Sequence, residues 1–139
     1  MKIDTQSFSI ETKGHTDIID ITGNVRKILS GSGLTEGSVL IFVPGSTAGI
    51  TTIEFEPGLL HDYPAFFEKV IPSDKSYRHN ETWHDGNGHA HVRASLQGGS
   101  FTVPFTGAKL LLGTWQQIVL IDFDARPRNR KVIVQLTGK

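Results

Sequence analysis

Short apolar segments rich in β-branched residues recur along the chain, and turn-forming residues separate them. Segments of this kind are typical of strands rather than of long helices. The segment from Ser38 to Val43 is apolar almost throughout, a pattern typical of a strand whose two faces are both buried. The sequence therefore constrains the chain to a fold built mainly from β-sheet.

The periodicity predicts an α+β fold with mixed or antiparallel sheets of about eight strands and with two or three helices. The expected strands cover residues 3–10, 17–21, 38–43, 50–55, 101–105, 109–112, 115–123 and 131–136. The expected helices cover residues 25–30, 57–70 and 90–96, with Pro64 bending or dividing the second. Gly107 and the segment 125–129 are expected to form hairpin turns. The polar segment 73–88 is expected to be a long functional loop.

Length and composition limit the function classes. A chain of 139 residues is about the size of one domain, so we expect a single domain over residues 1–139. The chain has no cysteine, which excludes thiolate catalysis and cysteine-based zinc or iron–sulfur sites. Its 14 Lys and Arg balance 14 Asp and Glu, so a general basic footprint for nucleic acid is absent. With no apolar run near the roughly 18 residues of a membrane span, and no signal-peptide pattern, we expect a soluble cytoplasmic protein.

A histidine-rich segment is the first candidate site. It carries His79, His84, His89 and His91, with Asp85 among them. Imidazole and carboxylate groups that converge can bind a divalent metal, Zn²⁺ or Mg²⁺. His89 and His91 share a face if they lie on a strand but diverge by about 200° on a helix. The alternative is that each histidine makes only local hydrogen bonds or faces solvent.

The segment PGSTAG between two predicted strands is the second candidate site. Its small residues allow backbone N–H groups to converge on an anion, and Ser46, Thr47 and Ala48 add no bulk. Arg93 and the turn arginines Arg126, Arg128 and Arg130 carry guanidinium groups suited to a phosphate or carboxylate clamp, and Gln116 adds an amide. An ordinary tight connection between strands is the alternative for the loop, and a solvated turn or an ion pair at a subunit contact is the alternative for the turn arginines.

Two carboxylates, Glu54 and Glu56, flank Phe55 and are expected to point to one face of a strand. Paired carboxylates can serve acid–base or metal chemistry, although such a pair is more often a solvated face. Trp83 lies in the polar segment, where an indole commonly packs over a site or against another subunit.

These segments together resemble the YjbQ-like family. The resemblance runs over nearly the whole chain. It includes the STAGIT loop, Glu54, His61-Asp62, the run DGNGHAH, LQGGS, Val103-Pro104, LGTWQ at 112–116, Arg130 and the closing QLTG. Two positions depart from the pattern, since many relatives carry a histidine where this chain has Gly45 and an asparagine where it has Ile53.

The resemblance implies a homotrimer with a polar site lined by the histidine segment and the small-residue loop. It also implies a secondary thiamine-phosphate synthase activity, which joins a pyrimidine methyl diphosphate to a thiazole phosphate and releases pyrophosphate. In this interpretation His91, Asp85 and Glu54 are catalytic. The anion is held by Ser46, Thr47, Ala48, Arg93, Gln116 and Arg130, and a metal by His79, His84, His89 and His91.

The sequence thus predicts a small homotrimeric protein that binds a phosphorylated or anionic small molecule and has thiamine-phosphate synthase-like activity. The alternative is a trimeric metabolite-binding or regulatory module without catalysis. Turnover of a substrate mixture distinguishes the two, since a sensor shows only saturable stabilisation by its ligand.

Overall fold

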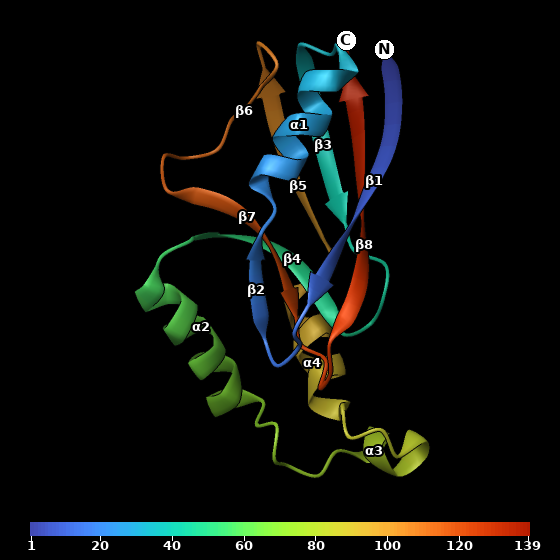
Figure 1. Cartoon of the computed structure of the whole chain (residues 1–139), viewed down its shortest axis with the longest axis vertical. Coiled ribbons are helices and arrows are strands. Elements are labelled where there is room, and N and C mark those ends of the chain that lie inside the picture. Colours follow the sequence, from blue (N-terminus) through green and yellow to red (C-terminus); the bar gives the residue numbers. More distant parts are fainter.

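A computed structural model describes residues 1–139, and it arranges eight strands in two antiparallel sheets (Figure 1). The larger sheet has the order β1-β8-β3-β5-β6 and the smaller has the order β2-β7-β4. The strands are β1 (Lys2–Thr12), β2 (Asp17–Asp20), β3 (Glu36–Phe42), β4 (Ala48–Glu54), β5 (Ser100–Thr106), β6 (Lys109–Leu110), β7 (Gln116–Asp122) and β8 (Arg128–Gly138). The predicted α+β class with about eight strands is confirmed.

The main hydrophobic core lies between the two sheets and beneath helix α1 (Thr22–Ser32). Alternating residues on each strand supply it, including Val39 and Ile41 of β3 and Ile118 and Leu120 of β7. Gly33, with a φ of 74°, ends α1 in a left-handed conformation that glycine adopts without steric cost. This core joins both sheets into one packed unit.

A second apolar cluster lies on the opposite face of the smaller sheet. It joins Val119 and Ile121 of β7 to helices α2 (Pro57–Val70) and α4 (Gly88–Gln97). Strand β7 is therefore the strand with both faces buried. For β3 that prediction is wrong, because Leu40 and Phe42 are 37% and 42% exposed on the outer face of the larger sheet.

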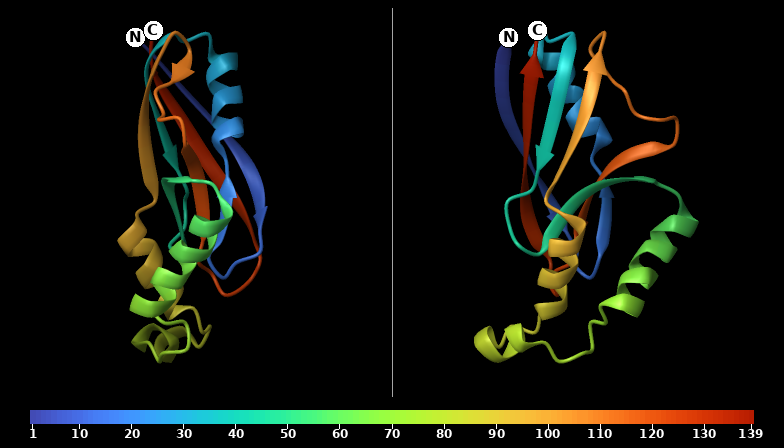
Figure 2. Two further views of the ribbon diagram at one scale, coloured as in Figure 1. Left: turned by 90° about the vertical axis from the view of Figure 1, so that its left-hand side faces the viewer. Right: turned by 180° about the vertical axis from the view of Figure 1, so that it is seen from behind.

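The helices differ from expectation in two places. Helix α2 continues through Pro64 as one helix instead of dividing there. A short helix, α3 (Arg78–Trp83), occupies part of the segment 73–88 that we expected to be loop, and it lies at the end of the molecule remote from both termini (Figure 2). No helix has the length and apolar composition that crossing a lipid bilayer demands.

The connection between β7 and β8 is not the predicted hairpin. Residues 123–127 carry the chain from the smaller sheet to the larger one, because β7 pairs with β2 and β4 whereas β8 pairs with β1 and β3. The turn at Gly107 does form a hairpin, between β5 and β6. The crossover places the end of β7 beside α4 and the loop between β3 and β4.

Candidate functional site

Two buried aspartates at the end of β7 organise a polar network. Arg130 of β8 donates to both carboxylate oxygens of Asp122, from Nε at 2.7 Å and from Nη2 at 2.9 Å. Arg130 Nη2 also donates to the hydroxyl of Thr47 at 2.7 Å, and that hydroxyl donates to Asp124 at 3.1 Å. The network thus connects the small-residue loop to both sheets.

Asp124 receives donors from three more places: the Asn87 amide at 3.2 Å, the Ala125 backbone N–H at 2.7 Å and the Arg128 Nε at 2.9 Å. Burial raises the pKa of Asp124, but these hydrogen bonds and that of Thr47 outweigh burial and bring the pKa down to about 2. Asp124 is therefore a permanent buried anion at neutral pH.

A cavity of about 330 Å³ opens beside this network, between the turn at 85–87 and the connection at 124–128. Its lining residues are Asp85, Asn87, Asp124, Ala125, Arg126 and Arg128. Arg128 forms an ion pair with Asp124 at 2.7 Å, whereas Arg126 is exposed and has no carboxylate partner within the chain. The cavity therefore offers one uncommitted guanidinium to an incoming anion.

His79 and His91 lie next to the turn that forms one wall. The His79 ring on α3 packs against the His91 ring on α4 at an interplanar angle of 37°, with centroids 4.1 Å apart. The His79 Nδ1 is 3.5 Å from a carboxylate oxygen of Asp85, which lines the cavity. This arrangement brings together the predicted residues His79, Asp85 and His91.

The surroundings of His91 favour its neutral form. Burial lowers the pKa of His91, the nearby His79 lowers it further, and Asp85 and Asp124 act in the opposite direction. A neutral imidazole at neutral pH can accept a proton. The surroundings of His91 thus do not favour an imidazolium that pairs with a bound phosphate at neutral pH.

The other two histidines of the segment lie apart from this pair. His89 is 4% exposed, packs near Tyr77, and has an unpartnered Nδ1, and burial lowers its pKa. His84 is exposed at the end of α3 with a φ of 57°. His89 and His91 diverge because α4 begins at Gly88.

The four histidines do not all converge in one chain, since His84 and His89 lie apart from the pair of His79 and His91. Within one chain, no group of three or more histidine, aspartate or glutamate side chains is arranged to hold a metal ion, whereas zinc sites in proteins have at least three protein ligands. The Zn²⁺ or Mg²⁺ site over the four histidines stays a prediction.

Arg93 is committed to the fold rather than to the cavity. Its guanidinium donates to the Ile71 carbonyl from Nε and Nη2, to Thr16 from Nη1 and to Glu68 from Nη2. Hydrogen bonds from the Ser73 N–H and from Arg93 lower the pKa of Glu68 to about 2. Arg93 therefore fastens the end of α2 to α4 and to the turn before β2.

The small-residue loop separates its members. Thr47 is buried in the aspartate network, whereas Ser46 and Ala48 line a smaller cavity of about 150 Å³ with Gly45 and residues of α4. Gly45 has a φ of 125°, and a Cβ there would lie 3.1 Å from Arg130 Nη1. Glycine adopts this φ without steric cost, and the backbone here lies close to Arg130.

Glu54 and Gln116 lie away from the histidines. They are register partners at the far ends of β4 and β7, and Gln116 donates to Thr52 at 2.9 Å. Ala48 begins β4 and Glu54 ends it, a span of about 20 Å for a strand. Glu56 is not on the same strand face as Glu54, because its carboxylate caps the first N–H groups of α2. The single chain thus does not bring Glu54 or Gln116 to the cavity.

Sequence reasoning missed Asp122 and Asp124 as site residues. The available signal was the segment DFDARPR, in which two carboxylates directly follow a continuous apolar run and two arginines follow them. Charged groups at the end of a strand that is buried on both faces must find partners, because an unpaired buried charge is costly. The burial of β7 was the missing information.

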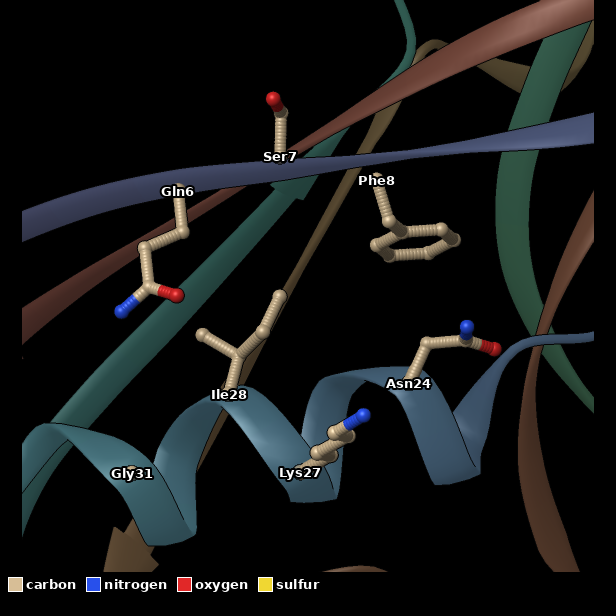
Figure 3. A pocket seen from close by; sticks show the side chains of 7 residues that line it. All are labelled: Gln6, Ser7, Phe8, Asn24, Lys27, Ile28 and Gly31. Atoms are coloured by element: carbon tan, nitrogen blue, oxygen red, sulfur yellow. The ribbon is translucent and has the colours of Figure 1, made fainter.

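A second hollow of about 330 Å³ lies on the other side of the fold, between β1 and α1 (Figure 3). Phe8 and Ile28 face each other across it, and Lys27 is its only charged lining residue. It contains no cluster of titratable groups. The cavity at the end of β7 is therefore the stronger candidate site.

The comparisons with known proteins all point to the same family. The profile of the family described as "UPF0047 protein YjbQ-like" matches residues 6–139. A UPF0047 protein of Methanothermobacter thermautotrophicus is 40% identical over 139 residues, which is 100% of this chain and 95% of the relative. YugU of Bacillus subtilis is 36% identical over 135 residues, covering 96% of this chain and 98% of the relative.

Solved structures agree with the sequence comparison. The crystal structure of a YbjQ-like protein from Sulfolobus solfataricus superposes with a TM-score of 0.94 at 33% identity, covering 99% of both chains. A YjbQ/UPF0047 protein from Clostridium acetobutylicum gives a TM-score of 0.87 at 39% identity, covering 95% of this chain and 99% of the other. The chain therefore belongs to the YjbQ-like, UPF0047 family.

Proposed function

We propose that this protein binds a small anionic molecule, in particular a phosphorylated one, in the cavity beside Asp124. The observation that carries the proposal is the convergence of residues from three separate segments on one cavity and its network: Thr47, the turn with Asp85 and Asn87, and the connection with Arg126 and Arg128. Arg126 is the group that meets the anion, since Arg128 is held by Asp124.

Within this proposal the reaction class is group transfer from a phosphorylated substrate, of the thiamine-phosphate synthase kind that the family resemblance implies. The thiazole nitrogen forms a bond to the pyrimidine methylene carbon, the bond from that carbon to the diphosphate oxygen breaks, and pyrophosphate leaves. No proton is lost in this step, so His91 is a positioning residue, which contacts His79 while His79 approaches Asp85 of the cavity. The second candidate is binding without turnover, which the same cavity supports.

The binding test uses inorganic phosphate and pyrophosphate as probes. Each probe is expected to stabilise the unaltered protein against thermal unfolding in a saturable way. The variant Arg126→Gln is expected to bind the probes at least tenfold more weakly. Arg26→Gln, on the exposed side of α1, is the matched control and is expected to bind normally. Equal affinity in Arg126→Gln and the control contradicts the proposal.

Turnover distinguishes the two candidate functions. An enzyme releases pyrophosphate from a mixture of a pyrimidine methyl diphosphate and a thiazole phosphate, and His91→Ala lowers that rate because it removes the ring that His79 contacts beside the cavity. His61→Ala, which removes a histidine that is 81% exposed on α2, is the control. Saturable binding without product release favours the binding module.

We also propose that the protein acts as a cytoplasmic homotrimer. The support is apolar surface that nothing in one chain covers: Leu40 and Phe42 on the outer face of the larger sheet, and Val92 and Leu96 on α4. The apolar residues 118–121 of β7 are fully buried within one chain and add no support for a trimer. Light scattering that gives the mass of a monomer at micromolar concentration contradicts the trimer.

A further inference from the structure

The cavity beside Asp124 has two chemically different sides. The connection after β7 supplies guanidinium groups, and of these Arg126 has no partner within the chain. The turn before α4 supplies acceptors, namely the carboxylate of Asp85, which is 47% exposed, and the amide oxygen of Asn87. The cavity is therefore lined by the unpaired guanidinium of Arg126 from one segment, and by the carboxylate of Asp85, which also approaches His79, and the amide of Asn87 from the other.

The amide of Asn87 is unusual for its position. Asn87 precedes α4, where an asparagine side chain ordinarily accepts a hydrogen bond from an N–H of the first turn. Here it makes no such bond, because its Nδ2 donates to Asp124 instead. Its Oδ1 is buried and receives no hydrogen bond from any donor in the chain, and the residue as a whole is only 6% exposed. A buried acceptor without a donor is costly, so this oxygen calls for a partner from outside the chain.

We propose, on the basis of the function proposed above, that the ligand is a small zwitterion: its anionic group meets Arg126, and an amino or ammonium group donates to Asp85 and Asn87. A ligand with an anionic group alone satisfies the guanidinium side but leaves the Asn87 oxygen unpaired and brings a second negative charge near Asp85. A ligand with both groups matches each side of the cavity, and discrimination against analogues that lack a donor is characteristic of such sites.

The test compares ethyl phosphate with 2-aminoethyl phosphate by isothermal titration calorimetry. The two probes share the phosphate and differ by one amino group. We expect 2-aminoethyl phosphate to bind at least tenfold more tightly. In Asp85→Asn that preference should fall below threefold, whereas Asp74→Asn, an exposed aspartate outside the cavity, should preserve it.

An NMR measurement tests the role of Asn87 in binding without replacing the residue. In ¹H–¹⁵N spectra, the side-chain NH₂ resonances of Asn87 should shift on saturation with 2-aminoethyl phosphate by at least twice as much as with ethyl phosphate. Equal shifts contradict the assignment of the amino group to Asn87.

The outcomes separate this inference from the function on which it rests. If both phosphates bind equally well, the zwitterion proposal is wrong and anion binding stands. If neither binds, both proposals are wrong. If the amino compound binds more tightly and Asp85→Asn keeps the full preference, the amino group is recognised elsewhere and the inference is overturned.

Discussion

The imidazole of His79 lies against that of His91 with ring centroids 4.1 Å apart, and the two rings come from different helices. The contact forms because the short turn at 84–87 returns the chain from α3 to α4. It places a partly buried histidine pair next to Asp85 and to the cavity at the end of β7. Two titratable rings at this distance must influence each other's protonation.

The first prediction concerns that coupling. Replacement of His79 by alanine should raise the pKa of His91, because the change removes the electrostatic effect of His79 and part of the burial that lower this pKa. An NMR titration of the His91 ring protons measures the shift. His61→Ala, which removes a distant exposed histidine, should leave the His91 titration unchanged. An unchanged or lower pKa in His79→Ala contradicts the coupling.

The second prediction concerns stability in acid. The pKa of Asp124 is about 2 in the folded protein, below its ordinary value of 3.8, so the folded state binds this proton less readily than the unfolded state. The resulting stabilisation is complete above about pH 4 and is lost as the pH falls toward 2. Asp124→Asn should lower the free energy of unfolding at pH 7 by about 2 to 4 kcal/mol.

Urea denaturation at pH 7, 5 and 3 checks this prediction. The deficit of Asp124→Asn relative to the unaltered protein should shrink between pH 5 and pH 3, because the unaltered protein loses part of the contribution of Asp124 over that range. A deficit that stays constant with pH means that the ionised carboxylate contributes little to stability.

The third prediction concerns the geometry of Arg130. Its two contacts with Asp122 and its contact with Thr47 require a planar guanidinium, which a lysine ammonium cannot replace. Arg130→Lys keeps the charge but should lower the free energy of unfolding by about 1 to 3 kcal/mol. Arg126→Lys, at an exposed position, should change it by less than about 0.5 kcal/mol. Equal effects of the two variants contradict a structural role for the Asp122–Arg130 pair.

The fourth prediction compares two glycines. Gly45→Ala places a Cβ 3.1 Å from Arg130 Nη1 at a φ of 125°, so it should lower the free energy of unfolding by about 1 to 2 kcal/mol. Gly31 lies in α1, where a Cβ meets no atom within 4 Å. Gly31→Ala should therefore raise stability by about 0.4 to 1 kcal/mol. Thermal or urea unfolding of both variants measures these changes. A Gly45→Ala variant with the same free energy of unfolding as the unaltered protein contradicts the prediction.

The strands and most helices follow from the sequence because local patterns encode them. Alternating apolar residues predict β8, glycine after an apolar helical pattern predicts the end of α1, and Pro57 marks the start of α2. The divergence of His89 and His91 likewise follows once α4 begins before them. These features depend on residues that are close neighbours in the chain.

The site itself depends on contacts that no local pattern contains. Both β3 and β7 are apolar segments, and only the packing of α2 and α4 against the smaller sheet buries the second face of β7. Because of that burial, the carboxylates of Asp122 and Asp124 need hydrogen-bond donors within the chain. Arg130 donates to Asp122, and Asn87 donates to Asp124. The sequence by itself determined the elements and the residue types available for anion chemistry, whereas the tertiary structure decided which of them meet, because burying a charge forces distant segments to supply its partners.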